Sequence, residues 1–264
     1  MKPTGEKLDS MTNKSRGAEP FGLVLLCLSV VGIVALALCI VALAGMAAAF
    51  IDAALFGWRP TMDRIVDVVH AAGSKHSILG LRAVLVFSIV VYGAIIVATL
   101  VFAHWRGGPT WRDLVGWRAP TVAITDRWVW AIIVAAVVYS FTAQVLLGRI
   151  DEDAHLALRI PADRVAALAL VALAVVIAPI TEELLFRGWI YTGLRYRLGV
   201  WPALILSSAV FAFAHYEDTH VYALAVFPVG LALGGLRQRT DSTKASILFH
   251  ALYNLTAVLL SAAE

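Results

Sequence analysis

Charged residues are scarce in this sequence. Asp, Glu, Lys and Arg make up 15% of its 264 residues, and apolar residues make up 61%. A soluble domain has about 25% charged residues. So few charges cannot solvate the surface of a soluble globular enzyme, a disordered chain or a nucleic-acid-binding module. The composition therefore predicts an integral membrane protein without a nucleic-acid partner.

Several signatures of other protein classes are missing as well. The two cysteines, Cys27 and Cys39, lie in one apolar run and cannot face each other from a single helix, so no disulfide framework is expected. No internal repeat is visible, which argues against an inverted-repeat transporter. The helical His-Glu-x-x-His signature of zinc proteases is absent. So are the Gly-x-Ser pattern of intramembrane serine proteases and the Gly-x-Gly-Asp pattern of aspartyl proteases.

Long apolar runs take the place of these signatures. The first run, Phe21–Ile51, has 31 residues and no charge. A signal-peptide apolar region has about 7 to 15 residues and a membrane span about 20, so a retained span is favoured over a signal cleaved near Ala42–Ala44. We predict an all-α transmembrane bundle of seven or eight spans. The further spans are expected near residues 83–104, 128–148, 165–190, 200–215, 221–236 and 245–262.

The pattern divides the chain into three regions. Residues 1–20 are predicted to be a disordered polar tail, residues 21–104 N-terminal membrane helices, and residues 105–264 a membrane-embedded core. Between the first two spans, Thr61 is expected to cap a short interfacial amphipathic helix that Gly73 ends. With the N-terminus in the cytosol, inside segments hold 13 Lys and Arg and outside segments hold 7, which favours that orientation.

The ionisable residues inside the spans are the informative ones, because a charge at a helix centre costs roughly 2.5 to 3.5 kcal/mol on insertion scales. Glu183 and Arg187 are i, i+4 neighbours and are expected to form an ion pair. Glu182 is rotated about 100° from Glu183 and lacks an obvious partner, which makes it a candidate base. Pro179 is expected to kink the helix just before this pair. The alternative is a charged cytosolic helix end.

Two further spans carry histidines. Phe211 and His215 lie one turn apart, and so do His250 and Asn254. A single histidine in a span can simply bond to a backbone carbonyl. Two histidines, two glutamates, an arginine and an asparagine in three successive polar-bearing spans point instead to function.

A depth argument places Glu182 and His215 at one level. On two antiparallel helices they share a depth if the turn lies midway, at position 198.5, where Gly199 is a natural helix stop and Pro202 a natural first-turn residue. The acidic connection at residues 216–220 must then lie outside the membrane or inside a water-filled cavity.

This set of side chains suits peptide hydrolysis. A carboxylate and a histidine can hold and deprotonate a water, while a second histidine and an amide can stabilise the oxyanion of a tetrahedral intermediate. It also suits a metalloprotease, in which Glu182, His215 and His250 would be the zinc ligands.

The three motifs Glu182-Glu183-x-x-x-Arg187, Phe211-x-x-x-His215 and His250-x-x-x-Asn254 resemble those of the CPBP family, the CAAX proteases and bacteriocin-processing enzymes, also called the Abi family. The family's eukaryotic relatives are the type II CAAX prenyl endopeptidases. The resemblance covers residues 111–262, because Trp111–Trp117 also looks like the family's linker. It implies an intramembrane protease, and family members of this size with few cysteines look prokaryotic, so a prokaryotic plasma membrane is expected. The site is expected toward the cytosol because the hairpin near Gly199 carries Arg195 and Arg197.

The resemblance also implies roles. Glu182 would be the general base, His215 its partner on the water, and His250 and Asn254 the oxyanion site. The site-organising residues would be Glu183, Arg187 and Phe211. Members have been described as metalloproteases and as metal-independent glutamic proteases, and we favour the latter, which needs no cofactor.

The expected partner is a membrane-associated peptide or protein, cleaved near its membrane-embedded or C-terminal end; whether it is lipidated stays open. Two rival functions remain. A proton-coupled transporter would also place Glu, His and Arg within spans. A non-catalytic membrane scaffold or immunity protein would need none of them.

Overall fold

The structure is a computed structural model that describes residues 22–74, 77–123, 125–150, 160–216 and 220–263. Within these ranges the regular structure is entirely helical, so the all-α prediction is confirmed there. The predicted tail at residues 1–20 and most of the acidic connection, residues 217–219, lie outside them. The longer elements are α2 Leu23–Phe56, α3 Trp58–Ala72, α4 Ile78–Gly107, α6 Arg127–Ile150, α10 Val200–Ala214, α11 His220–Thr240 and α12 Thr243–Ala263.

One composite helix carries the glutamate pair. It consists of α7 Arg164–Ala172, the π-helical turn η2 Leu173–Ile177, α8 Ala178–Glu182, the π-helical turn η3 Glu183–Ile190 and α9 Tyr191–Leu198. Pro179 lies in the first turn of α8, between the two π-helical turns. Proline lacks a backbone donor, and π-helical turns change the direction of the side chains that follow them. The irregularity predicted at Pro179 therefore spreads over both flanking turns.

Among the described residues, four helices are long and apolar enough to cross a bilayer: Leu23–Phe56, Ile78–Leu114, Arg164–Leu198 and Thr243–Leu260. Two shorter apolar helices, Arg127–Ala143 and Val200–Ala214, accompany them. The chain is therefore an integral membrane protein, but the predicted count of seven or eight spans is not confirmed. The first helix also runs five residues beyond Ile51, because Asp52 keeps its carboxylate satisfied with a hydrogen bond from Thr61 and an ion pair to Arg64.

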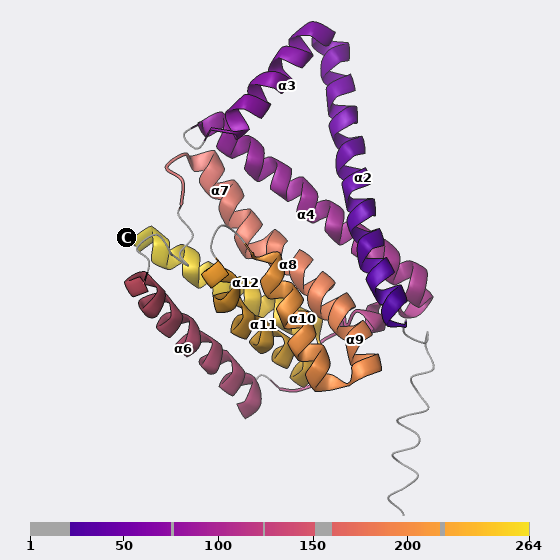
Figure 1. Cartoon of the computed structure of the whole chain (residues 1–264), viewed down its shortest axis with the longest axis vertical. Coiled ribbons are helices and arrows are strands. Elements are labelled where there is room, and N and C mark those ends of the chain that lie inside the picture. Colours follow the sequence, from indigo (N-terminus) through magenta and orange to yellow (C-terminus); the bar gives the residue numbers. More distant parts are fainter. Residues whose placement is uncertain (1–21, 75–76, 124, 151–159, 217–219, 264) are drawn as a thin grey trace, which may run out of the picture.

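The interfacial helix begins earlier than the sequence predicts. Its N-cap is Gly57, which ends α2 with a φ of 88°, so the prediction that Thr61 caps it is wrong. The Thr61 hydroxyl instead donates to Asp52 Oδ2 at 2.7 Å, which ties α3 back to α2. The predicted end at Gly73 is confirmed. Figure 1 shows α2, α3 and α4 as three sides of a triangle, with α3 on the side remote from the other helices.

Asp163 joins α4 to the composite helix. One of its oxygens accepts the backbone N–H of Ala166 at 2.9 Å and so caps α7. The guanidinium of Arg82 on α4 donates to both oxygens of the same carboxylate, at 2.9 and 2.6 Å. Hydrogen bonding from Arg82 lowers the pKa of Asp163 to about 2. This contact fixes the depth of α4 relative to the helix that carries Glu182.

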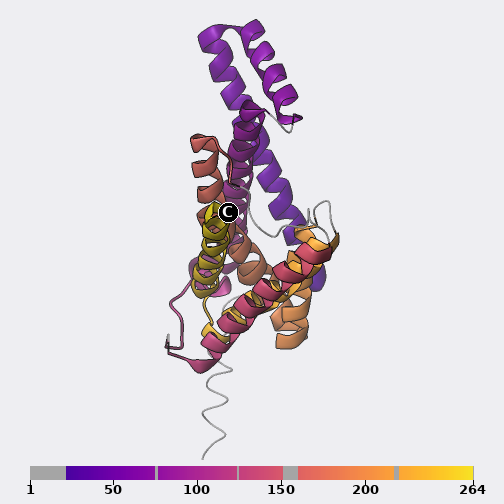
Figure 2. The ribbon, with the colours of Figure 1, turned by 90° about the vertical axis from the view of Figure 1, so that its left-hand side faces the viewer.

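The hairpin between α9 and α10 lies where the sequence predicts it. Gly199 ends α9 with a φ of 82°, a conformation that costs a glycine little, and α10 begins at Val200. From this turn, α10 packs along α9 and against α11. Figure 2, turned by 90°, shows α6 running alongside α11. The main core cluster takes buried residues from the composite helix and from α2, α4, α6, α10, α11 and α12.

Candidate active site

Three of the ionisable residues that the sequence singles out converge in one cavity. Glu182 ends α8, His215 follows α10, and His250 lies in α12. All three line a cavity of about 350 Å³, which Asn254 and Phe211 also line. Residues of α4, α6 and α11 complete its wall. The depth argument from the position of the hairpin therefore agrees with the observed geometry.

The carboxylate of Glu182 faces both imidazoles. Its Oε2 lies 3.8 Å from Nε2 of His215 and 3.8 Å from Nε2 of His250. These distances exceed a direct hydrogen bond, but they suit groups that share a bridging water. The other oxygen, Oε1, accepts a hydrogen bond from the Tyr92 hydroxyl at 3.2 Å. Glu182 is 8% exposed, so little bulk water competes for these contacts.

His215 is oriented by the helix that precedes it. Its Nδ1 lies 2.8 Å from the carbonyl oxygen of Phe211, one turn earlier. A carbonyl only accepts, so Nδ1 carries the proton in this contact and neutral His215 presents an unprotonated Nε2 to Glu182. The ring of Phe211 packs 4.5 Å from the His215 ring and 6.0 Å from the His250 ring. Phe211 thus separates and supports the two imidazoles.

Behind His250 lies a fully buried ion pair. Glu183 Oε1 accepts from Arg187 at 2.9 Å and contacts His250 Nδ1 at 3.0 Å, and Glu183 and Arg187 are both 0% exposed. The i, i+4 pair expected from spacing is therefore present. Arg187 also donates to the carbonyl of Gly230 at 3.0 Å and lies 4.2 Å over the ring of Phe211. Through Glu183, the pair positions His250 at its Nδ1 atom, a contact that the sequence spacing did not indicate.

Asn254 lies one helical turn after His250 and lines the same cavity. Its Nδ2 donates to the carbonyl oxygen of Ala174 at 2.8 Å. Ala174 belongs to the first π-helical turn. An amide nitrogen has two N–H donors, so this bond leaves Asn254 a second one.

Sequence analysis missed Tyr92. It comes from α4, in the N-terminal part of the chain where no motif was found, and its tyrosine ring looks unremarkable inside an apolar run. A second missed contact closes the cavity between α6 and α12, where the Tyr253 hydroxyl donates to Ser140 Oγ at 2.6 Å. Neither pairing has a sequence signal, because 90 and 113 positions separate the partners.

The zinc alternative named Glu182, His215 and His250 as ligands. Within the described ranges, no group of three or more His, Cys, Asp or Glu side chains is arranged to hold a metal ion. The described residues therefore give the metalloprotease expectation no support.

Residues 164–256 match the family model described as type II CAAX prenyl endopeptidase Rce1-like. This segment is therefore similar to the type II CAAX prenyl endopeptidases. It contains Glu182, His215, His250 and Asn254, in agreement with the resemblance to CAAX proteases. No curated protein and no solved structure matches the chain.

The matched segment covers the composite helix and α10 to α12 up to residue 256. The match begins at residue 164, so it does not reach the Trp111–Trp117 linker on which the resemblance also relied. Tyr92, Tyr139 and Ser140 line the cavity from outside the matched segment. The cavity is therefore completed by helices that are not part of the family match.

Proposed function

We propose that this chain is an intramembrane endopeptidase that hydrolyses a peptide bond near the membrane-embedded or C-terminal end of its substrate. The observation that carries the proposal is the convergence of Glu182 Oε2 with the Nε2 atoms of His215 and His250, at 3.8 Å each, inside the segment that matches the Rce1-like family model. The cavity also supplies the donors that peptide hydrolysis needs.

In the proposed mechanism, a water lies between Glu182 and His215. Glu182 takes a proton from it while the water oxygen attacks the carbonyl carbon of the substrate. His250, protonated on both nitrogens, donates to Glu183 from Nδ1 and to the developing oxyanion from Nε2. The second N–H of Asn254 also stabilises that oxyanion. The oxyanion then re-forms the carbonyl, the C–N bond breaks, and Glu182 transfers its proton to the leaving amine, which leaves a carboxylic acid on the other fragment.

The proposal is tested with the purified full-length chain in liposomes that carry membrane-anchored peptides. The peptides are offered in matched lipidated and unlipidated forms, and mass spectrometry identifies the new termini. We expect cleavage close to the anchor, and the preferred form identifies the substrate class. Peptide flux without cleavage would favour a transporter, and neither flux nor cleavage would favour a scaffold.

Chelation separates the two hydrolytic mechanisms. In the favoured glutamic mechanism, Glu182 and the imidazoles activate the water themselves. Prolonged dialysis against a strong chelator is therefore expected to leave the cleavage rate within about twofold of the untreated rate. The metal content of the same preparation is measured in parallel by mass spectrometry. A loss of activity that added zinc restores would overturn the metal-independent mechanism.

Tyr92 is proposed as a positioning residue for Glu182. Replacing Tyr92 with Phe removes the hydroxyl that holds Oε1 but keeps the ring. A hydrogen bond to a charged group contributes about 1.5 to 3 kcal/mol, so kcat is expected to fall roughly tenfold or more. KM should stay nearly constant, because Tyr92 holds the base rather than the substrate.

The control for this prediction is Tyr139→Phe, a change in another tyrosine that lines the same cavity. We expect it to keep a kcat close to that of the unmodified protein. An equal fall in kcat for both variants, or a change in KM alone, would contradict a positioning role for Tyr92.

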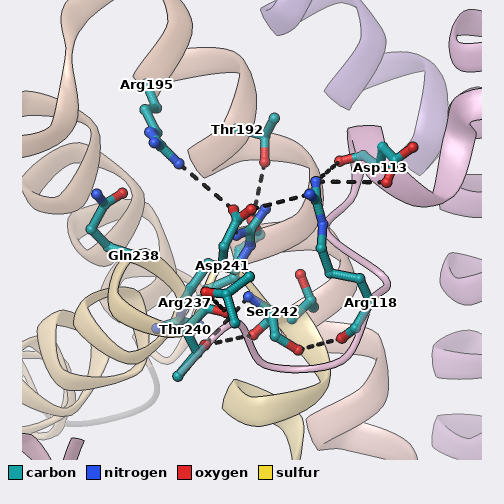
Figure 3. A network of polar contacts seen from close by, with 12 residues as sticks. Asp113, Arg118, Thr192, Arg195, Arg237, Gln238, Thr240, Asp241 and Ser242 are labelled. Atoms are coloured by element: carbon teal, nitrogen blue, oxygen red, sulfur yellow. Dashed lines mark hydrogen bonds and ion pairs between the residues drawn. The ribbon is translucent and has the colours of Figure 1, made fainter. Parts of the chain in front are cut away.

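We also infer that the α9–α10 end of the bundle faces the cytosol of a prokaryotic cell. Arg118, Arg195 and Arg237 come from three separate basic segments, yet all three lie around Asp241 (Figure 3). Segments rich in Lys and Arg favour the cytosolic side. A cysteine introduced at Arg197 tests this orientation. It should react with a membrane-impermeant reagent only when the reagent has access to the cytosolic side of the membrane.

A further inference from the structure

A second cavity, of about 250 Å³, lies between α6, α11 and α12. It shares no lining residue with the cavity around Glu182. Its walls are apolar: α6 contributes Val129 and Ile133, α12 contributes Leu248 and Leu252, and α11 contributes Leu236. We call this cavity the apolar groove. In a membrane-spanning bundle, an apolar groove can bind an acyl chain.

The segment at residues 115–123 closes one end of the apolar groove, where Pro120 belongs to the lining. Five hydrogen bonds fasten this segment to the α11–α12 corner. Thr121 donates its N–H and its hydroxyl to the Thr240 carbonyl at 2.8 and 3.0 Å, and the Ser242 hydroxyl donates to the Arg118 carbonyl at 2.6 Å. Thr243 donates its N–H to the Gly116 carbonyl at 2.9 Å and its hydroxyl to the Val115 carbonyl at 2.6 Å. The closed end is therefore preformed.

Gly116 shows how closely the segment packs at this corner. Its φ is 64°, and a Cβ at this position would lie 2.2 Å from the guanidinium of Arg237, which is 2% exposed. Only a glycine fits both the backbone conformation and the space. The closed end of the apolar groove is thus held beside a buried positive charge.

Positive charge is in excess around this end. Residues 112–127 and 237–244 together contain six basic and three acidic residues. The carboxylate of Asp241 is shared by Arg118 at 3.1 Å, Arg237 at 2.9 Å and Arg195 at 4.0 Å (Figure 3). A single carboxylate thus faces three guanidinium groups. The excess favours an anionic ligand.

Two exposed cations remain available to such a ligand. Among the described residues, neither Arg127 nor Lys244 is paired with a carboxylate. The guanidinium of Arg127 lies 5.5 Å from the ring centre of Trp128, and the ammonium of Lys244 lies 5.0 Å from that of Trp117. Tryptophans beside basic residues are typical of the headgroup level of a bilayer.

In the sequence, these two cations lie next to residues that line the apolar groove. Lys244 directly precedes the lining residue Ala245, and Arg127 comes two positions before the lining residue Val129. An occupant must therefore combine an apolar chain with an anionic head. We propose that the apolar groove binds an anionic phospholipid, whose acyl chain lies between α6 and α12 and whose phosphate meets Lys244 and Arg127. This site is independent of the proposed peptidase activity.

The test uses the purified full-length chain in a neutral detergent. Binding of phosphatidylglycerol and of phosphatidylcholine with identical chains is measured by native mass spectrometry, and inorganic phosphate is added as a third probe. We expect phosphatidylglycerol to bind at least tenfold more tightly than phosphatidylcholine, since each basic residue near the surface adds to the attraction of an anionic lipid. Phosphate alone should bind no better than chloride.

Two variants locate the site. The double variant Arg127→Gln/Lys244→Gln is expected to lose most of the preference for phosphatidylglycerol. The matched control Arg59→Gln/Arg164→Gln removes two exposed charges elsewhere and should keep it. Ala245→Phe, which places a ring in the apolar groove, should weaken the binding of both lipids.

Thermal unfolding of every variant shows whether it still folds. If Ala245→Phe does not fold, the Arg127→Gln/Lys244→Gln variant still tests the proposal. Equal binding of the two lipids by the unmodified chain would overturn the proposal. So would a preference that survives in the Arg127→Gln/Lys244→Gln variant. Tight binding of inorganic phosphate alone would replace the lipid site with a simple anion site.

Discussion

Replacing Glu182 with Gln is expected to lower the rate of peptide cleavage by about a thousandfold. General acid–base catalysis contributes typically 10²–10⁴-fold, and the amide of Gln cannot take the proton of the water. The substitution preserves the size of the side chain, and its amide oxygen can still accept the Tyr92 hydrogen bond. Single-turnover cleavage of the membrane-anchored peptide measures the loss, and thermal unfolding shows whether the fold is intact.

Two further variants make this result specific. His215→Ala removes the imidazole on the opposite side of the proposed water and should cause a loss of similar order. Asp113→Asn neutralises an acidic residue whose side chain is 69% exposed, and should leave the rate unchanged. Full activity in both Glu182→Gln and His215→Ala would refute the proposed mechanism.

The second large effect concerns the buried pair behind His250. In Glu183→Ala, the guanidinium of Arg187 remains at a site with no solvent exposure and loses its counter-ion. Removal of one partner of a buried ion pair typically costs about 3 to 5 kcal/mol, because the other charge is left uncompensated. We expect a loss of that order in the free energy of unfolding, measured by denaturant titration in mild detergent.

The double variant Glu183→Gln/Arg187→Met provides the matched comparison. It removes both charges at similar volume, so part of the stability lost in Glu183→Ala should return. The exposed pair Arg64–Asp52 is a surface reference, for which Arg64→Ala is expected to cost about 1 kcal/mol or less. If Glu183→Ala costs no more than Arg64→Ala, the buried pair does not stabilise this fold.

A stable Glu183→Gln/Arg187→Met variant also separates stability from catalysis. In this variant His250 keeps a hydrogen-bond acceptor at position 183 but loses the negative charge beside Nδ1. If that charge stabilises the doubly protonated His250 that donates to the oxyanion, cleavage should remain slow even though the protein folds. If this variant recovers both stability and activity, the buried pair has a structural role only.

The sequence by itself determined the class of protein and the local arrangement of its charges. The sequence has too few charges for a water-exposed surface, and its apolar runs reach the length of about 20 residues that crosses a bilayer. Together these two features indicate a membrane protein. The spacing of Glu183 and Arg187 and the turn at Gly199 depend on helical geometry alone, and both are found as predicted. The order of the three motifs indicated the family that the match at residues 164–256 supports.

Only the tertiary structure decided which groups meet across the bundle. Tyr92 reaches Glu182 from 90 positions away, and Glu183 reaches His250 from 67 positions away. The physical reason is that helices in a bilayer are apolar on the lipid-facing side as well as on the packed side, so hydrophobic periodicity does not identify the packed face. The partners of Glu182, the start of α3 at Trp58 and the apolar groove therefore became visible only once the helices were placed together.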